Sequence, residues 1–290
     1  MKNKKIFLLG VGAQKGGTTW LHSQLSKQPN VDMGFTKEYH VFDALFSEEC
    51  VCFKKQVING VLKKNENGNL GINKEDKHHI TKRLSFIDNT ENYFDYFDYL
   101  YLKNDLVQMV GDITPSYSML SEDAFSYIKS NLEKRGFHVK VVFLMRDPME
   151  RVWSMLRMNR RNLERQGKKS LTTETEALKS MYSSVQVRLR TDYPRTISEL
   201  EKVFSKSDIY YGFYETLFTK PSYESLKEFL SIDIGEPDFE FKTNVSPKSL
   251  DIDVGLKEEV VNFYSDVYRD IEKISDGYSR SIWGGYSYLP

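Results

Sequence analysis

A short apolar segment followed at once by a glycine-rich turn constrains this chain more than any other feature. Residues 6–11 (IFLLGV) form a continuous apolar run, which is typical of a strand covered on both faces in a parallel sheet. Residues 12–19 (GAQKGGTT) follow as a tight turn, and apolar residues then recur at helical spacing until Pro29. This order of strand, turn and helix predicts the first unit of an α/β fold, with the helix N-terminus facing the turn.

Further strands and helices alternate along the chain. A second buried strand is expected at residues 139–145 (VKVVFLM), and others near residues 106–111 and 208–214. Helices are expected near residues 121–135, 149–166, 222–230 and 255–274. This alternation predicts an α/β fold with a P-loop-like parallel sheet flanked by helices on both faces.

The domain organisation is predicted to be simple. Nothing in the sequence resembles an interdomain linker, so residues 1–290 are expected to form a single domain. Residues 54–80 contain many Asn, Lys and Gly residues with little periodicity, and we interpret them as a flexible insertion.

The glycine turn suits a phosphate-like group. Backbone N–H groups and the positive end of the helix dipole both face such a turn. Gly12 and Gly17 have the separation of the nucleoside triphosphate P-loop, G-x-x-x-x-G-K-[ST], but Thr18 stands where that loop has its lysine. The turn's own lysine is Lys15. We therefore expect an anion site unlike that of a kinase, and the alternative is a turn without a ligand.

A second anion-binding element follows the strand at residues 139–145. Arg146 lies at the carboxyl end of this strand, the edge where open α/β sheets bind ligands. Its guanidinium can bind a phosphate with two parallel hydrogen bonds, and Ser154 follows in the next helix, one turn after Arg151. The two elements predict a site for two separate phosphate-like groups. The alternative is a solvated basic helix capped by Asp147.

Together these motifs resemble those of sulfotransferases that use 3′-phosphoadenosine-5′-phosphosulfate (PAPS). Residues 14–21 (QKGGTTWL) are similar to the family's 5′-phosphosulfate loop, and residues 146–154 (R-D-P-x-x-R-x-x-S) to its 3′-phosphate motif. Residues 37–43 (KEYHVFD) and 112–117 (DITPSY) resemble the E-x-H-F-F-D and E-K-T-P-S-Y segments of heparan-type and related bacterial enzymes. Residues 210–217 resemble the family's later strand, which has a Y-E-x-L ending. Residues 242–248 resemble the loop that closes over the nucleotide.

The resemblance implies an enzyme that transfers a sulfuryl group in line from PAPS to an acceptor hydroxyl or amine, without a metal. Catalysis would rest on positioning and charge stabilisation, with the charge of Lys15 directed at the bridging oxygen of the leaving phosphate. The residues implied for PAPS and its product, adenosine 3′,5′-bisphosphate, are Lys15, Gly16, Gly17, Thr18, Thr19, Trp20, Arg146, Ser154 and Lys248.

On the acceptor side, Glu38 matches the family's general base. His40 is two residues further on and would face the same side of an extended segment. A carboxylate near a lysine-bearing loop should be ionised at neutral pH, as a base must be. The alternatives are a surface glutamate in a charged turn and a histidine packed in the interior.

One position departs from the heparan-type pattern. Ile113 stands where those enzymes have a lysine, so either another residue such as Lys37 compensates or the acceptor is less anionic than heparan. A heparan substrate is therefore not carried over. Asp112, Tyr117 and Lys37 are candidate substrate contacts, and the alternative for Asp112 is capping the turn before Pro115.

The composition excludes several other classes of protein. Lys and Arg number 41, as do Asp and Glu, and the resulting neutral net charge argues against a strongly basic nucleic-acid-binding body. Two cysteines, Cys50 and Cys52, are too few for a disulfide framework or a zinc site built mainly from Cys. Residues 6–11 are too short to span a bilayer, so we expect a cytoplasmic protein without a membrane partner, whose oligomeric state the sequence leaves open.

Two further side-chain groups have competing interpretations. Aromatic residues crowd the segment 93–101 and are expected to belong to the core rather than to an acceptor wall. A basic set is expected to lie on a solvated helix and its end rather than along an acidic glycan: Arg157, Arg160, Arg161, Arg165, Lys168 and Lys169. The acceptor is expected to be a small molecule or a glycan. A P-loop nucleotide kinase and a non-catalytic nucleotide-binding module are the alternative functions.

Overall fold

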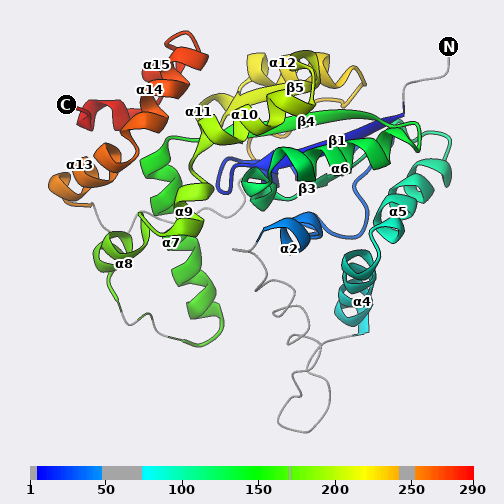
Figure 1. The fold of residues 1–290 in the computed structure, drawn as a ribbon, viewed down its shortest axis with the longest axis horizontal. Coiled ribbons are helices and arrows are strands. Elements are labelled where there is room, and N and C mark those ends of the chain that lie inside the picture. Colours follow the sequence, from blue (N-terminus) through cyan, green and yellow to red (C-terminus); the bar gives the residue numbers. More distant parts are fainter. Residues whose placement is uncertain (1–4, 48–73, 169, 171, 242–251) are drawn as a thin grey trace, which may run out of the picture.

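The computed structural model describes residues 5–47, 74–168, 170, 172–241 and 252–290. In these residues a five-stranded parallel sheet has the order β2-β3-β1-β4-β5 (Figure 1). The strands are β1 (Ile6–Gly12), β2 (Val31–Asp32), β3 (Met109–Ile113), β4 (His138–Met145) and β5 (Ile209–Phe213). The predicted parallel sheet is confirmed.

The central strand, β1, shows why the first apolar run has no polar alternation. All seven of its residues are buried, because β3 and β4 flank it and helices cover both faces of the sheet. Phe7, Leu9 and Val11 belong to one hydrophobic core, whereas Ile6 and Leu8 belong to the other. Both sets of side chains on the strand therefore pack away from water.

Helices form a layer on each face of the sheet. The core that contains Leu8 is completed by α1 (Thr18–Leu25) and α12 (Lys220–Leu230), and the core that contains Phe7 by α5 (Glu91–Leu102), α6 (Glu122–Glu133) and α10 (Tyr193–Val203). The remaining helices are α2 (Phe42–Phe46), α4 (Lys74–Asp88), α7 (Pro148–Arg165), α8 (Glu174–Met181), α9 (Val185–Leu189), α11 (Tyr214–Leu217), α13 (Val254–Phe263), α14 (Ser265–Ile274) and α15 (Tyr278–Ile282), with the short 3₁₀ turns η2 (Pro115–Met119), η3 (Lys206–Asp208) and η4 (Gly284–Tyr288).

Some sequence predictions need correction. The single helix expected at residues 255–274 is wrong, because Tyr264 separates α13 from α14. The ring of Tyr264 is buried, and its hydroxyl donates to the carbonyl oxygen of Tyr182, so the chain turns at this residue. Of the predicted insertion, residues 54–73 lie outside the described residues, and residues 74–80 are the start of α4. The single domain stays a prediction. The aromatic segment on α5 does join the core, through Tyr93, Phe94 and Phe97.

The parallel arrangement brings functional segments to one edge of the sheet. Every strand ends at that edge, so the glycine turn after β1, the turn after β3, Arg146 after β4 and Tyr214 after β5 meet there. None of the helices in the described residues combines the length and the apolar character that crossing a bilayer requires.

Candidate active site

The glycine turn after β1 is shaped by two positions that admit no side chain. A Cβ at Gly16 would lie 2.3 Å from the carbonyl oxygen of Leu144 at the end of β4. Gly17 is the N-cap residue of α1, with φ of 95°, and has no side chain with which to cap the helix. The first-turn amides of α1 therefore suit a negatively charged group from outside the helix.

A cavity of about 750 Å³ lies at this edge of the sheet. It brings together most of the residues implied for the donor and the general base. The predicted residues that line it are Lys15, Gly17, Thr18, Thr19, Trp20, Glu38, His40, Arg146 and Ser154. Segments more than a hundred residues apart in the sequence thus share one cavity.

Lys15 carries its charge in an environment already rich in cations. Its backbone has φ of 72°, in the left-handed region. Burial, followed by the positive charges of Arg161 and Arg146, lowers the pKa of Lys15 to about 8. A bound anion would relieve this repulsion, so the site favours negatively charged ligands.

Arg146 also lines this cavity. Its Nη1 donates to the carbonyl oxygen of Lys15 at 3.3 Å, Nη2 lies 3.4 Å from Glu150 Oε2, and the guanidinium lies 4.1 Å from the centre of the Tyr214 ring. The Nε atom is buried and has no hydrogen-bond partner among the described residues. An external acceptor such as a phosphate oxygen would satisfy it.

The turn that carries Arg146 is held by buried polar groups. The N–H of Asp147 donates to Glu215 Oε1 at 3.0 Å, and the hydroxyl of Tyr193 donates to the carbonyl oxygen of Arg146 at 2.8 Å. Asp147 itself caps α7 by accepting from the N–H of Glu150 at 3.3 Å. The capping interpretation of Asp147 is therefore correct, and the cap also fixes the backbone of Arg146.

Glu38 and His40 form a charged cluster in the same cavity. His40 Nδ1 lies 2.6 Å from Asp43 Oδ2, and Nε2 lies 3.2 Å from Glu38 Oε2. Lys37 donates to the other oxygen of Glu38, and the hydroxyl of Ser116 donates to Asp43. The Glu38 carboxylate is thus held between a lysine and an imidazole, and both Glu38 and His40 line the cavity.

These contacts determine the charge states of the pair. Burial alone would raise the pKa of Glu38, but the hydrogen bond from His40 and the charge of Lys37 outweigh it and lower the pKa to about 2. Burial would lower the pKa of His40, but hydrogen bonds to Asp43 and Glu38 raise it to about 9. At neutral pH the pair is therefore a carboxylate and an imidazolium.

The sequence matches the family model described as a sulfotransferase domain over residues 4–245. The chain belongs to the sulfotransferase family. A sulfotransferase from Alicyclobacillus acidocaldarius has a similar structure, with a TM-score of 0.62 and 18% identity over 92% of this chain and 94% of that one. The sulfotransferase domain of the Synechococcus PCC 7002 olefin synthase matches with a TM-score of 0.43 and 13% identity over 89% of this chain and 93% of that one. A comparison with curated proteins finds no match.

Family membership confirms the resemblance seen in the motifs and makes this chain a transferase. At 18% identity, the likeness to the Alicyclobacillus structure confirms the predicted α/β fold of a sulfotransferase. The roles of individual residues rest on the geometry of this chain.

Two predicted substrate contacts of this sulfotransferase lie in its interior. Asp112 and Tyr117 are both 0% exposed, and neither lines the cavity, so their expected contact with substrate is corrected. The reason is the length of β3. The strand was expected to end at residue 111, but it runs to Ile113 and carries Asp112 inside the sheet. Ile113, where heparan-type enzymes have lysine, is likewise buried in the core.

Asp112 instead organises the segment that carries Glu38 and His40. Its carboxylate accepts hydrogen bonds from the hydroxyls of Thr114 at 2.6 Å, Tyr117 at 2.9 Å and Tyr93 at 3.0 Å. Thr114 Oγ1 in turn accepts from the N–H of Tyr39 at 3.0 Å. The Tyr117 hydroxyl also accepts, from the N–H of Val41 at 3.3 Å. Both backbone neighbours of His40 are therefore tied to one buried carboxylate.

The remaining predicted residues occupy supporting positions or fall outside the described residues. Gly16 packs against β4 rather than lining the cavity, and Lys37 reaches the site through Glu38. Arg151 is fully buried and donates to the carbonyl oxygen of Val187 at 3.2 Å. Lys248 lies outside the described residues.

Beyond the predicted Trp20, the sequence analysis missed that one end of the cavity is aromatic. Trp20 stacks on Phe239 with an interplanar angle of 11° and ring centres 6.1 Å apart, and its Nε1 donates to the Asp238 carbonyl at 3.1 Å. The other aromatic side chains at this end are Tyr214, Phe218 and Phe241. Tyr214 lies in the segment 210–217 that resembles the family's later strand, whereas no motif marked Phe218 and Phe241.

Some of the basic residues on α7 that were expected to face solvent line the cavity instead. Arg157, Arg161 and Arg165 line the cavity. Arg157 is only 7% exposed, so the expected solvated position is wrong for it, whereas Arg165 is exposed as expected. Arg160 does lie on the outer side, paired with Glu164 and Glu174. Spacing alone did not reveal which side of α7 faces the site.

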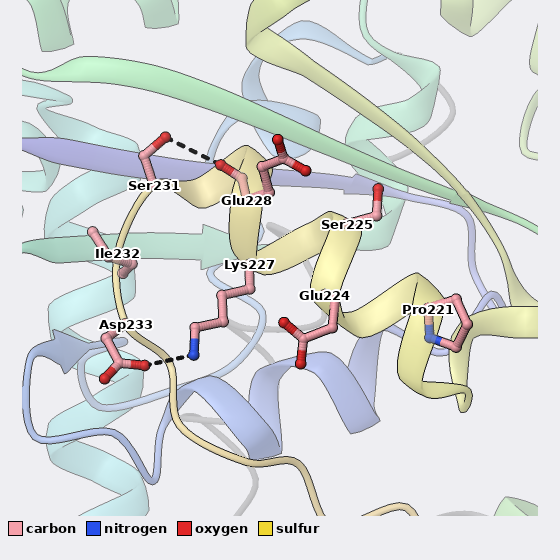
Figure 2. A pocket seen from close by; sticks show the side chains of 8 residues that line it. All are labelled: Pro221, Glu224, Ser225, Lys227, Glu228, Ser231, Ile232 and Asp233. Atoms are coloured by element: carbon pink, nitrogen blue, oxygen red, sulfur yellow. Dashed lines mark hydrogen bonds and ion pairs between the residues drawn. The ribbon is translucent and has the colours of Figure 1, made fainter.

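A second hollow, of about 660 Å³, lies beside α12 and the loop that follows it (Figure 2). Two of its polar groups are paired within it: Lys227 Nζ lies 2.8 Å from Asp233 Oδ1, and the Ser231 hydroxyl donates to the backbone carbonyl of Glu228 at 3.1 Å. None of the motif residues lines this hollow.

Proposed function

We propose that this sulfotransferase transfers a sulfuryl group from PAPS to an acceptor hydroxyl or amine, with Glu38 as general base. One observation carries the proposal: Lys15 with its glycine turn, Arg146 with Ser154, and Glu38 all line a single cavity. Two anion-binding elements and a carboxylate are the groups that in-line transfer between a bisphosphate donor and a hydroxyl requires.

The described residues fit a donor with two separated anionic groups. The amides of α1 and the Lys15 ammonium suit the 5′-phosphosulfate, while Arg146 and Ser154 suit the 3′-phosphate. The unsatisfied Nε of buried Arg146 supports a ligand oxygen at this point. The aromatic end around Trp20 offers apolar faces for an adenine ring.

In the transfer, a bond forms between the acceptor oxygen and sulfur, and the bond from sulfur to the 5′-phosphate oxygen breaks. Lys15 neutralises the charge that develops on that phosphate oxygen, and Glu38 accepts the proton that the acceptor loses. A carboxylate with a pKa of about 2 is a weak base. This suits a loose transition state, in which the acceptor becomes acidic only after the leaving bond has largely broken.

His40 is better placed to orient Glu38 than to act as the base itself. Both of its ring nitrogens face carboxylates, and its pKa of about 9 keeps it protonated at neutral pH. An imidazolium cannot accept a proton, whereas its charge holds the Glu38 carboxylate in place.

The test is a transfer assay with labelled PAPS against a panel of glycans, phenols and aliphatic alcohols. The Glu38→Gln variant should bind adenosine 3′,5′-bisphosphate as the wild type does and lose turnover. Glu258→Gln, an exposed position on α13, is the matched control and should keep full activity. Unchanged turnover in Glu38→Gln would remove Glu38 from the base role.

A thermal-shift measurement distinguishes the proposed function from the two alternatives, a P-loop nucleotide kinase and a non-catalytic nucleotide-binding module. Adenosine 3′,5′-bisphosphate should stabilise the protein more than ATP with magnesium, because ATP has no 3′-phosphate for Arg146. Stabilisation by ATP and magnesium alone would contradict the proposal. Binding of the bisphosphate without transfer to any acceptor in the panel would favour the module.

A further inference from the structure

The side of α7 that faces the cavity carries arginine at successive turns. Arg157, Arg161 and Arg165 follow Ser154 at spacings of three or four residues, which places them on one side of the helix. The helix extends from the edge of the sheet away from the strands (Figure 1). The arginines therefore continue the cavity beyond the point where Arg146 and Ser154 lie.

Arg157 is buried in a way that calls for an external anion. It is 7% exposed, and neither its Nε nor its Nη1 has a hydrogen-bond partner among the described residues. Its guanidinium stacks on the ring of Trp153 at 4.5 Å, which holds the group in place but supplies no acceptor. The charges of Glu150 and Glu174 act on it as well; Glu150 lies 3.4 Å from Arg146, and Glu174 lies 3.4 Å from Arg160 and accepts from Trp153 Nε1. A buried guanidinium whose N–H groups lack acceptors lowers the stability of the folded protein, unless a ligand supplies the missing acceptors.

The cavity is lined by more basic side chains than the two elements assigned to the donor contain. Six Lys or Arg side chains and one carboxylate, Glu38, are among the described residues that line it. PAPS carries about four negative charges, and the elements assigned to them are the Lys15 turn and Arg146 with Ser154. The remaining cations are Arg157, Arg161, Arg165 and Arg190.

Arg161 lies close to where the reaction would occur. Among the charged groups that act on Lys15, Arg161 has the largest effect on its pKa. Glu38 lines the same cavity. A ligand held by Arg157 and Arg161 would therefore lie within reach of both the leaving group and the base.

We propose that the acceptor carries an anionic group, such as a carboxylate or sulfate, next to the hydroxyl that is sulfated, and that Arg157 and Arg161 bind this group. This inference rests on the proposed function, since it names the class of acceptor for the same cavity. The arginines hold the acceptor by its anion and leave its hydroxyl facing Glu38.

The test compares acceptors that differ only in this charge. The probes are 3-hydroxybenzoate and its methyl ester, and a glucuronide and the matching glucoside, each assayed with PAPS. The acid of each pair should have a kcat/KM at least about tenfold higher, the difference of one charge-assisted hydrogen bond. Arg157→Gln and Arg161→Ala should each remove most of this preference while leaving the Kd for adenosine 3′,5′-bisphosphate within about twofold. Arg160→Ala, on the outer side of the same helix, is the matched control and should keep the preference.

Equal rates for acid and neutral probes, or a loss of bisphosphate affinity in both arginine variants, would overturn the inference and leave sulfuryl transfer itself intact. If no probe is sulfated, the proposed function fails for this panel. Whether Arg157 and Arg161 bind an anion is then tested separately, by calorimetry with 3-methoxybenzoate on the protein saturated with adenosine 3′,5′-bisphosphate. Binding that both variants weaken supports the site, and absence of binding overturns it.

Discussion

Asp112 accepts a 2.6 Å hydrogen bond from the hydroxyl of Thr114, and through this bond a buried carboxylate reaches the segment that carries Glu38. Thr114 receives the N–H of Tyr39, the residue between Glu38 and His40. A second connection runs from Asp112 through Tyr117 to Val41. Asp112 thus positions the proposed base without touching the cavity.

Asp112→Asn should therefore impair catalysis more than donor binding. The substitution weakens both connections, and displacement of Glu38 by even a fraction of an ångström should lower kcat by about ten- to a hundredfold. The free energy of unfolding should fall by about 1–3 kcal/mol, because buried hydroxyls lose a charged acceptor. Asp123→Asn, exposed on α6, is the control. An unchanged kcat in Asp112→Asn would contradict the positioning role.

Lys15→Ala should lower kcat by about 10²–10³-fold, the usual effect of removing one group that stabilises transition-state charge. Calorimetry should also show that wild-type affinity for adenosine 3′,5′-bisphosphate declines as the pH rises above about 8, where Lys15 of the free protein loses its charge. In Lys15→Arg this decline should disappear. If only the acceptor KM changes in Lys15→Ala, the assignment of Lys15 to the leaving group is wrong.

Gly16→Ala should distort the glycine turn, because the added Cβ would lie 2.3 Å from the Leu144 carbonyl oxygen. Affinity for the bisphosphate should fall at least about tenfold, which calorimetry measures directly. Gly284→Ala is the control, since a Cβ there meets nothing within 4 Å and should leave affinity unchanged. Equal affinities of the two variants would show that the turn tolerates the side chain.

The His40 cluster predicts a pH dependence of stability. The pKa of His40 is raised to about 9 in the folded protein, so its contribution to stability is fully present below the ordinary value of 6.5 and is lost as the pH rises through about 9. The slope should be at most about 1.4 kcal/mol per pH unit. Urea unfolding between about pH 6 and about pH 10 should show this loss in the wild type and a smaller one in His40→Gln. An identical slope in the wild type and in His40→Gln would refute the cluster's contribution.

Sequence patterns were sufficient to predict an element or its position where one local feature determines it. The uninterrupted apolar runs of β1 and β4 predict buried strands, and the glycine turn and Arg146 predict the edge of the sheet at which the cavity lies. Asp112 was misplaced because the end of β3 depends on tertiary packing, and an aspartate three residues before a proline is compatible with a turn. The side of α7 that carries Arg157 was missed for a related reason. Arginines recur around this helix, and only the packed structure shows which of them face the cavity.

The most direct test of the central claim is calorimetry with two nucleotides that differ only in the 3′-phosphate. We predict that the wild type binds adenosine 3′,5′-bisphosphate at least about tenfold more tightly than adenosine 5′-monophosphate, and that Arg146→Ala removes this difference while retaining affinity for the monophosphate. Equal affinity of the wild type for the two nucleotides, or an undiminished difference in Arg146→Ala, would contradict the assignment of this cavity to the activated sulfate donor.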